Sequence, residues 1–302
     1  MLPCRQRSET YPTALPYAYP YELRHQLLPQ AADLLRADEI EIDLFKCPPW
    51  RDLIAEASAL APVYVHFPLV AGQPSLRETD WGEVKRLLEE TNTPFVNVHF
   101  EVTADVYPEM AVNTRDPRDA EKLTERLIED VRYVAQHVGA ERVIAENIVY
   151  RGHKWDVLRP CVQPGVIRTV LEETDCGLLL DLSHARLSAH YLEVEEPGVT
   201  LWNYLAALPM GRLRELHLTG IHFHRGKLSD HLPLSEFDWE VTERAFESIR
   251  AGTWREPHTV AFEYGGVGPI FEWRSRKEVI AEQVPCFYDL VHAATPTKPR
   301  TY

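Results

Sequence analysis

Six short apolar runs in this chain each end on a residue that can bind a metal ion, and this pattern constrains the fold more than any other feature. The six residues are His66, His99, Glu146, Asp181, His217 and Glu263. The intervals between them are 33, 47, 35, 36 and 46 residues. One strand–helix–strand unit takes about 30 or more residues, so each interval holds one unit with a loop of variable length. The spacing therefore predicts parallel strands whose carboxyl ends converge on one site.

Strands and amphipathic helices are expected to alternate along the chain. Several of the expected strands are nearly continuous apolar runs, as in strands buried on both faces. The strands are expected at Ala14–Tyr19, Glu39–Phe45, Val63–Phe67, Phe95–Phe100, Arg142–Asn147, Gly177–Leu182, Leu213–Leu218 and Thr259–Tyr264. The helices are expected at Glu22–Arg36, Trp50–Ser58, Trp81–Glu90, Asp116–Val138, Gln163–Glu173, Trp202–Leu208, Asp238–Arg250 and Arg274–Val291. This α/β pattern predicts a (β/α)8 TIM barrel, as a single domain over residues 1–302 with tails at about 1–11 and 295–302.

Composition excludes several other classes of protein. The chain has 302 residues, of which 45% are hydrophobic, enough to bury a sizeable core. Its net charge of −14 disfavours binding to nucleic acid, because an acidic surface repels phosphates. The sequence contains no run of 18 apolar residues and no apolar core of the signal-peptide type near its start. We therefore expect a cytoplasmic protein that does not enter a membrane.

The cysteines do not form a recognisable framework. They are five in number, scattered and never spaced as C-x-x-C, at Cys4, Cys47, Cys161, Cys176 and Cys286. This distribution argues against structural disulfides and against a thiolate zinc site. Cys47 follows a strand and could face the site, but buried cysteines are usually inert, so it is not among the expected ligands.

The candidate metal ligands are all nitrogen or oxygen donors. They are His66, His99, Glu146, Asp181, His184, His217, Asp230, His231 and Glu263. Imidazole suits zinc, iron, cobalt or nickel, whereas carboxylates also suit magnesium and manganese. A carboxylate can bridge two metal ions about 3.5–4 Å apart, so this many ligands predicts two or three divalent ions. Asn147, beside Glu146, is a further candidate as a ligand or as a hydrogen-bond donor behind the ligands.

Each candidate also has a structural interpretation. A histidine at a strand end can be a hydrogen-bonded structural residue, Asp181 can cap the following helix, and Asp230 can form a turn. Glu146 and Glu263 are harder to explain in this way, because each follows a buried strand and a buried carboxylate without a cation or donors is costly. We expect Glu146, Glu263 and His184 to be catalytic as well as metal-binding.

Loop residues near these strand ends are candidates for substrate contacts. His222 and His224 lie just after the strand that ends near His217. Arg186, Arg225 and Lys227 could bind an anionic group, although basic residues are more often exposed without such a role. The GGVG segment at 265–268 could bind a phosphate at the last strand end, but it lacks a full phosphate-loop pattern.

The order of the ligands resembles that of the xylose isomerase-like metal barrels, the superfamily that includes endonuclease IV. In that nuclease the ligands are His, His, Glu, D-x-x-H, His, D-x-H and Glu. The matching residues here are His66, His99, Glu146, Asp181 with His184, His217, Asp230 with His231, and Glu263. The resemblance implies the barrel and a multinuclear site. It departs where Asp230 and His231 are adjacent, and the long basic DNA loops are not evident, which disfavours DNA as substrate.

Four segments resemble a second branch more closely. ENIVY, LLLDLSHARLSAHY, ELHLTGIHF and DHLPLSEFDWE look like the multinuclear non-haem iron enzymes that oxidatively modify cysteine-containing peptides. This resemblance implies iron as the favoured metal, with zinc or manganese as alternatives. It also implies a peptide substrate and a partner protein that presents it. The usual Asn-Asn after the sixth-strand Asp is replaced here, within Leu182-Ser183-His184, and the branch's typical opening segment is not evident.

Three enzymatic functions remain open on this basis. The favoured one is iron-dependent oxidation of a cysteine-containing peptide. The second is a sugar isomerase or epimerase acting on a small-molecule substrate, in which Glu146 and Glu263 would move protons while a metal polarises the carbonyl. The third is phosphodiester hydrolysis of the endonuclease IV type. A non-enzymatic binding protein is disfavoured, because polar groups without a role are costly to bury.

Overall fold

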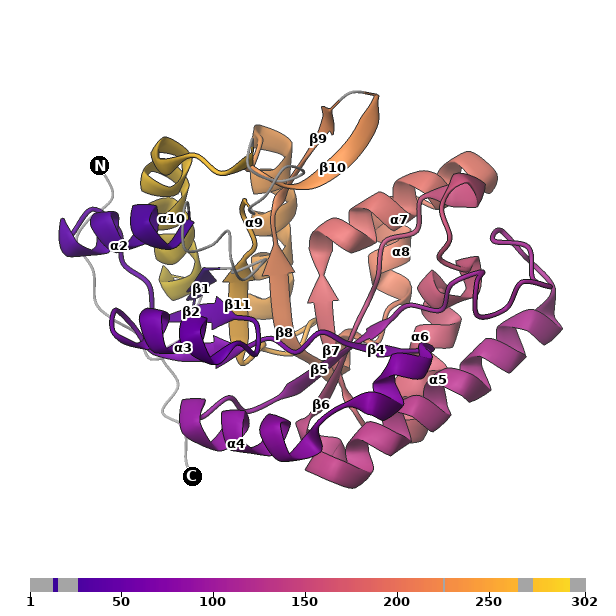
Figure 1. Cartoon of the computed structure of the whole chain (residues 1–302). Coiled ribbons are helices and arrows are strands. Elements are labelled where there is room, and N and C mark those ends of the chain that lie inside the picture. Colours follow the sequence, from indigo (N-terminus) through magenta and orange to yellow (C-terminus); the bar gives the residue numbers. More distant parts are fainter. Residues whose placement is uncertain (1–12, 16–26, 225, 266–273, 294–302) are drawn as a thin grey trace.

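A computed structural model describes residues 13–15, 27–224, 226–265 and 274–293, and its arrangement is shown in Figure 1. The two expected tails, Arg225 and most of the GGVG segment lie outside the described residues. Among the described residues, no helix is long and apolar enough to cross a membrane.

Nine strand segments form one sheet, in which every pairing is parallel, in the order β3–β2–β1–β11–β8–β7–β6–β5–β4. Their bounds are β1 (Thr13–Leu15), β2 (Leu44–Cys47), β3 (Val63–Val65), β4 (Leu69–Ala71), β5 (Val96–Phe100), β6 (Val143–Glu146), β7 (Gly177–Asp181), β8 (Leu213–Leu218) and β11 (Thr259–Phe262). Eight of these segments overlap the eight expected strands, although β2 begins five residues later than expected and ends two residues later. The ninth, β4, was not predicted. The expected first strand extends past Leu15 into residues outside the described part of the chain.

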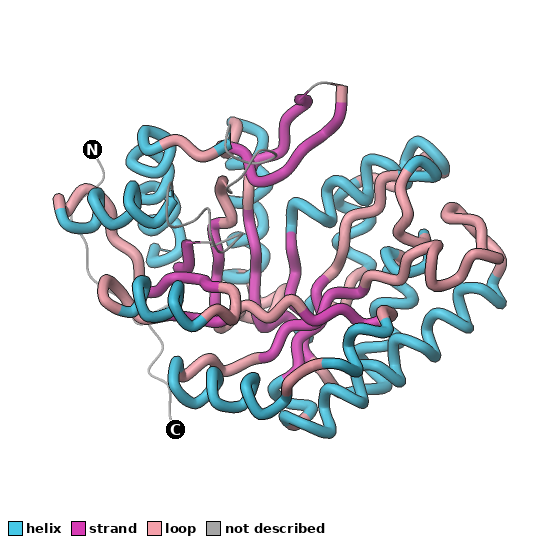
Figure 2. The backbone as a smooth tube through the Cα atoms, in the orientation of Figure 1, coloured by secondary structure: helices cyan, strands magenta, loops and turns pink. Residues whose placement is uncertain are grey.

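The sheet closes into a barrel through β3 and β4. These two segments belong to one stretch of chain, which is interrupted between His66 and Pro68. β3 pairs with β2, whereas β4 pairs with β5 on the other side. The same stretch therefore joins both ends of the sheet, and the predicted (β/α)8 barrel is confirmed. Figure 2 shows the strands inside and the helices around them.

Apart from α7, each of the described helices overlaps a predicted helix. Their bounds are α2 (Leu27–Arg36), α3 (Arg51–Ser58), α4 (Trp81–Thr91), α5 (Pro117–Val138), α6 (Pro164–Thr174), α7 (Leu182–Glu195), α8 (Leu201–Ala207), α9 (Glu236–Arg250) and α10 (Lys277–Ala293). The longest, α5, begins where the Asp116 side chain accepts a hydrogen bond from the Arg118 amide and ends at Gly139. Gly139 has a positive φ of 91°, a conformation that glycine adopts without a steric penalty.

Helix α7 and the hairpin strands β9 (Gly220–His224) and β10 (Lys227–Leu232) were also not predicted. Helix α7 buries side chains on most of its circumference, including Ser183 and Ser188, so its sequence lacks the clear apolar stripe of a surface helix. The antiparallel hairpin of β9 and β10 directly follows β8 and projects beyond the barrel in Figure 1. A Cβ at Gly220 would lie 1.8 Å from the Pro233 carbonyl oxygen, so only glycine fits where the hairpin leaves the strand.

One connected apolar cluster fills the space between strands and helices. Every residue of β7 is buried, and the buried stripe of α5 is formed by Leu123, Leu127, Val131 and Val134. Such dense packing holds the strand ends in fixed positions, which is what a precise arrangement of polar side chains requires.

Candidate metal centre

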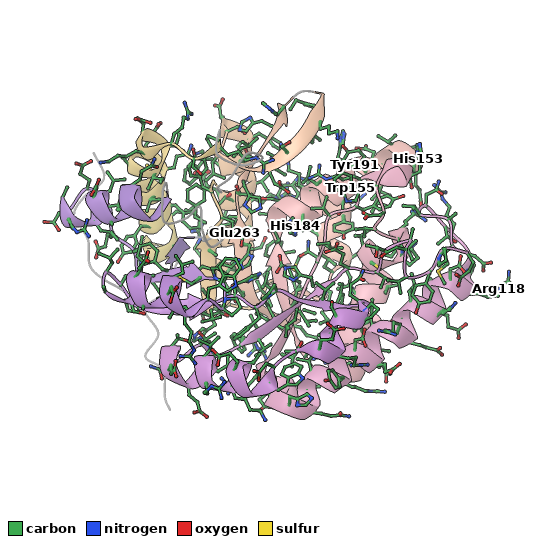
Figure 3. All side chains as sticks on the ribbon, viewed as in Figure 1. Arg118, His153, Trp155, His184, Tyr191 and Glu263 are labelled. Atoms are coloured by element: carbon green, nitrogen blue, oxygen red, sulfur yellow. The ribbon has the colours of Figure 1, made fainter. Side chains whose placement is uncertain are left out.

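The carboxyl ends of the barrel strands bring the predicted ligands together. His99, Glu146, Asp181 and His217 lie at or near the ends of β5, β6, β7 and β8, and Glu263 directly follows β11. His184 lies in the first turn of α7, three residues after Asp181; Figure 3 labels His184 and Glu263. We divide the cluster into two parts. The Glu146 half consists of His66, His99, Glu146, Asp181 and His184, and the Glu263 half consists of Lys46, Tyr64, Glu215, His217 and Glu263.

Glu146 lies at the centre of the cluster and is only 2% exposed. Its Oε2 lies 3.0 Å from His99 Nε2 and 3.6 Å from His66 Nε2. Its Oε1 lies 3.6 Å from His184 Nδ1 and 3.9 Å from His217 Nδ1. The two oxygens therefore face different sets of imidazoles, which is the arrangement of a carboxylate that can bridge two ions.

Backbone carbonyls orient three of the candidate histidines. Nδ1 of His99 lies 3.1 Å from the Leu69 oxygen, and Nδ1 of His184 lies 2.9 Å from the Asn147 oxygen. Nδ1 of His231 lies 2.8 Å from the Glu263 carbonyl oxygen. When Nδ1–H donates to a carbonyl, the neutral ring keeps its Nε2 lone pair for another partner. Metal-binding histidines are commonly held in this way.

The residues in the Glu146 half fit a bound metal. Two sets within this half have ligand atoms that all lie within 4.8 Å of one another, His66/His99/Glu146 and Glu146/Asp181/His184. Two further sets extend into the Glu263 half, His66/Glu215/His217 and Asp181/His217/Glu263. Among the described residues, the buried Oε2 of Glu146 and Nδ1 of His66 have no hydrogen-bond partner. A buried polar atom without a partner is costly, and a cation at Glu146 Oε2 would remove that cost.

The Glu263 half is internally paired. Lys46 Nζ donates a hydrogen bond to the Glu263 carboxylate and lies 3.2 Å from each ring nitrogen of His217. His217 Nδ1 lies 3.1 Å from Glu263 Oε1, and its Nε2 lies 2.6 Å from Glu215 Oε1. Glu215 in turn accepts a hydrogen bond from the Tyr64 hydroxyl.

Sequence reasoning missed Lys46 and Glu215. Glu215 lies two residues before His217 in β8, so strand alternation places both on one face and could have identified it. Lys46 lies between Phe45 and Cys47 in β2, and a single lysine in a short strand carries no signal of its own. A lysine there is expected to reach solvent, yet Lys46 is 3% exposed.

The charges of the cluster shift the pKa values of its members. Burial alone would lower the pKa of His99, but the adjacent Glu146 carboxylate raises it to about 9. Burial raises the pKa of Asp181 to about 6. Burial and the positive charge of Lys46 both lower the pKa of His66.

The two glutamates are held in their ionised form. Burial opposes ionisation of Glu146, but the imidazoles of His99 and His66 hold its pKa well below the ordinary value. Burial also opposes ionisation of Glu263, whose pKa is lowered by His217 and Lys46. Glu146 thus depends on imidazoles alone, whereas Glu263 also has an ammonium beside it.

Asp230 and His231 lie in the β9–β10 hairpin, next to the cluster but outside the sets of closely grouped ligand atoms. The Asp230 carboxylate lies 3.6 Å from the guanidinium groups of both Arg151 and Arg274. A register irregularity in β10 falls at these residues, and His231 has a left-handed φ of 55°. This bend allows two adjacent residues to face the barrel mouth, which a regular strand would not.

The other candidates have local partners. Asn147 exchanges two hydrogen bonds with the backbone of Asp181, so its amide holds β6 and β7 together. Arg186 donates to the Asp238 carboxylate. His222 Nε2 lies 2.7 Å from the Pro233 oxygen. Cys47 is fully buried, and burial raises its pKa, which does not favour the thiolate form.

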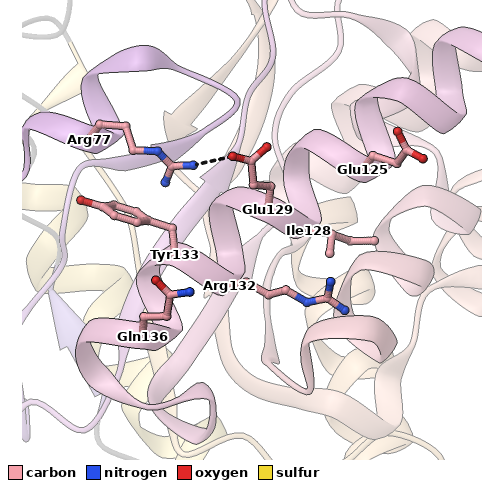
Figure 4. A pocket seen from close by; sticks show the side chains of 7 residues that line it. All are labelled: Arg77, Glu125, Ile128, Glu129, Arg132, Tyr133 and Gln136. Atoms are coloured by element: carbon pink, nitrogen blue, oxygen red, sulfur yellow. Dashed lines mark hydrogen bonds and ion pairs between the residues drawn. The ribbon is translucent and has the colours of Figure 1, made fainter.

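A hollow of about 590 Å³ lies against α5, away from these residues. Figure 4 shows its lining, which is formed by Arg77, Glu125, Ile128, Glu129, Arg132, Tyr133 and Gln136. Its charged groups pair locally, with Arg77 3.3 Å from Glu129 and Arg132 3.4 Å from Glu173. None of the candidate ligands lines it, so the strand ends remain the candidate site.

Solved structures with the same fold include metabolic enzymes and a nuclease. D-psicose 3-epimerase from Clostridium cellulolyticum H10 aligns with a TM-score of 0.50 at 13% identity, covering 94% of this chain and 99% of that one. An AP endonuclease, family 2, from Brucella melitensis aligns with a TM-score of 0.52 at 12% identity, covering 91% and 99%. At these identities the similarity shows the barrel fold and no more.

Sequence relatives match part of the chain. A UPF0276 protein from Pseudomonas aeruginosa strain UCBPP-PA14 is 32% identical over 125 residues, and another from Anaeromyxobacter sp. strain Fw109-5 is 26% identical over 104 residues. The first match covers 40% of this chain and 40% of the relative; the second covers 34% and 30%. A family model described as RiPP precursor modification enzyme MbnB/TglH/ChrH matches residues 48–253, well over half of the chain. This chain therefore belongs to the MbnB/TglH/ChrH family of RiPP precursor modification enzymes.

Proposed function

We propose that this protein is a non-haem iron enzyme that oxidatively modifies a cysteine-containing precursor peptide. The family supports a peptide-modifying enzyme. The donor set supports iron, because His66, His99 and Glu146 provide two imidazoles and one carboxylate, the combination typical of non-haem Fe(II) oxygenases. Zinc and manganese accept the same donors and are the alternatives that metal analysis must exclude.

The observation that carries this proposal is the position of Glu146. One oxygen faces His66 and His99, and the other faces His184 and His217. Glu146 would thus hold two ions at once, one with His66 and His99 and the other with Asp181 and His184. Bound ferrous ions would supply the binding and reduction of dioxygen at open coordination positions.

The protein's own groups would position the substrate and move protons. We assign proton transfer to Glu263 and His184, which line the cluster next to Lys46 and Asp181 respectively. Asp230 and His231 would act from the hairpin, either as additional ligands or as contacts to the substrate. Burial of the cluster excludes water, which strengthens every one of these interactions.

The rim of the barrel supports a peptide as substrate. Trp155, in the loop after β6, is 47% exposed, and Phe223, in β9, is 72% exposed. Arg151 links these segments, since it donates a hydrogen bond to the Leu228 oxygen and its guanidinium lies 5.6 Å from the centre of the Trp155 ring. Exposed aromatic side chains at the mouth of a polar site are suited to extended peptides. A separate protein that presents the peptide is part of this proposal.

The experiment that tests the proposal begins with metal analysis of protein purified without oxygen. We expect two or three irons per chain and visible absorbance. The iron-loaded protein is then given oxygen and a pool of cysteine-containing peptides, with serine versions of the same peptides as controls. Consumption of oxygen and a mass change in cysteine peptides alone would support the proposal.

Two results would instead favour the other enzymatic functions. A single manganese or magnesium ion, with proton exchange into a ketose, would indicate an isomerase or epimerase. Zinc with cleavage of a duplex at an abasic site would indicate a hydrolase. If no metal is bound on purification or on reconstitution, the metal centre itself is refuted.

A further inference from the structure

Lys46 places a positive charge inside the barrel, among the candidate ligands. Its side chain is 4% exposed and comes from β2, between the buried residues Phe45 and Cys47. Removing an ammonium group from water is costly unless a carboxylate and further acceptors surround it. Lys46 has such a partner in Glu263, so its burial depends on one of the candidate ligands.

Lys46 contacts residues that also form one of the candidate metal sites. Asp181, His217 and Glu263 form a set whose ligand atoms lie within 4.8 Å of one another. Two of these three ligands are already in contact with Lys46 Nζ, which lies 3.2 Å from both ring nitrogens of His217. A divalent ion bound there would lie within a few ångströms of the ammonium group, and the two like charges would repel strongly at low dielectric.

The same contacts leave the ligands of the Glu146 half free of pairing with Lys46. Lys46 Nζ donates its hydrogen bond to Glu263, whereas Glu146 Oε2 lies 3.0 Å from His99 Nε2 and 3.6 Å from His66 Nε2. The ammonium group therefore neutralises one end of the cluster and not the other.

We propose that the Lys46 ammonium group is a resident cation that takes the place of a metal ion between His217 and Glu263. It thereby restricts metal binding to the Glu146 half of the cluster. This inference rests on the proposed metal centre and limits the number of metal ions that the centre can bind. Two ions remain, one with His66, His99 and Glu146 and the other with Glu146, Asp181 and His184.

The test compares the number of ions bound by wild type and by Lys46→Met, which keeps the length of the side chain and removes its charge. Both proteins are stripped with a chelator, reconstituted without oxygen with Fe(II) and, separately, with Co(II), and desalted. Metal per chain is then measured by mass spectrometry. We expect two ions in wild type and three in Lys46→Met, since the freed Glu263 and His217 can bind the additional ion.

Two further variants check the location of the additional ion. Lys46→Arg keeps a positive charge and is expected to bind two ions, as wild type does. Lys46→Met combined with Glu263→Gln removes a ligand of the new site, and the count should return to two. An unchanged count in Lys46→Met would refute the inference while leaving the proposed metal centre intact.

A measurement on wild type covers the case in which Lys46→Met does not fold. Anomalous scattering from crystals of the Co(II)-loaded protein locates each ion directly. Ions beside Glu146, and none between His217 and Glu263, support the inference. An ion bound between His217 and Glu263 in wild type overturns it. If wild type binds no ion by either measurement, both the inference and the proposed metal centre fail.

Discussion

The two halves of the ligand cluster lie side by side at the same end of the barrel, but different groups neutralise their buried carboxylates. In the Glu146 half, the carboxylate lies among imidazoles, with its Oε2 3.0 Å from His99 Nε2 and 3.6 Å from His66 Nε2. In the Glu263 half, the carboxylate is paired with Lys46, and His217 lies between Glu215 and Glu263. The Glu263 carboxylate thus has an ammonium group beside it, whereas the Glu146 carboxylate has imidazoles beside it.

This difference shows that ligand residue types alone do not define a metal site. Glu146 and Glu263 both follow buried barrel strands and both face imidazoles. What separates them is one lysine on β2, a strand distant in sequence from both β6 and β11. A buried carboxylate beside an ammonium group has a positive charge that offsets its desolvation, whereas a carboxylate beside imidazoles has such a charge only when they are protonated.

The largest expected effect is that of Glu146→Gln. Without the charge that faces both sets of imidazoles, we expect the loss of both ions and a fall in activity of at least about 1000-fold. Metal analysis and the peptide oxidation assay measure the two effects. The matched control is Glu125→Gln on the exposed face of α5, which should retain its metal. A Glu146→Gln protein that binds as many ions as wild type would show that Glu146 is not a metal ligand.

The next effect concerns stability without metal. In the chelated protein, Lys46→Met leaves Glu263 buried without its ammonium partner, so the free energy of unfolding should fall by about 3–5 kcal/mol. Urea denaturation followed by circular dichroism measures this change. Lys227→Met, in the exposed hairpin, serves as control and should change little. Addition of metal should restore part of the loss in Lys46→Met, and no loss at all would show that the pair does not stabilise the fold.

The pH dependence of stability provides a third test. The folded protein raises the pKa of His99 to about 9, above the ordinary value of 6.5. The stabilisation is therefore complete below pH 6.5 and is lost as the pH rises through 9, a change on the order of 3 kcal/mol. Chelated protein should thus become less stable between pH 6.5 and 9. Metal-loaded protein should not follow this trend, because a bound imidazole is already neutral.

The variant His99→Gln is the control for this pH dependence. It removes the titrating group, so chelated His99→Gln should lose the His99 part of the slope between pH 6.5 and 9. Denaturation curves collected at half-unit intervals of pH would reveal the difference. A wild-type protein whose stability is flat over this range would show that Glu146 does not hold a proton on His99.

The smallest effect is expected from Tyr64→Phe, which acts behind the Glu263 half. The hydroxyl of Tyr64 donates to Glu215, which in turn contacts His217. Its loss should lower the free energy of unfolding by about 1–2 kcal/mol, as for a buried hydrogen bond to a charged group. Metal content should stay the same if, as we propose, the Lys46 ammonium group takes the place of a metal ion in this half. Loss of an ion in Tyr64→Phe would indicate that a metal ion binds at His217. The proposed difference between the two halves would then be wrong.

Much of the fold was predictable because barrel strands follow a simple physical rule. A parallel strand buried on both faces must be apolar along its length, so each strand is visible as a short apolar run. Polar residues that end such runs, such as Glu146 and Asp181, are conspicuous against that background. The break between β3 and β4 and the helix α7 were not predictable, since their sequences carry no matching period.

The candidate ligands were selected from sequence, but their roles were not. Strand register places His99 beside Glu146 and Asp181 beside His217 in neighbouring strands. Lys46 and Glu215 escaped notice because a lysine or glutamate within a strand usually faces solvent. Whether such a side chain points into the barrel depends on how the barrel closes and on which side chains inside it can pair with the charge.

The sequence by itself determined the barrel, and it predicted that a sulfur-free set of candidate donors lies at the carboxyl ends of the strands. These follow from local patterns, because strand periodicity and donor type are properties of short segments. Only the tertiary structure decided which groups lie beside each buried carboxylate: imidazoles beside Glu146, and the Lys46 ammonium group beside Glu263. That outcome depends on distances between residues more than 200 positions apart, as in the Lys46–Glu263 pair, and electrostatic energy is a function of distance and burial rather than of sequence order.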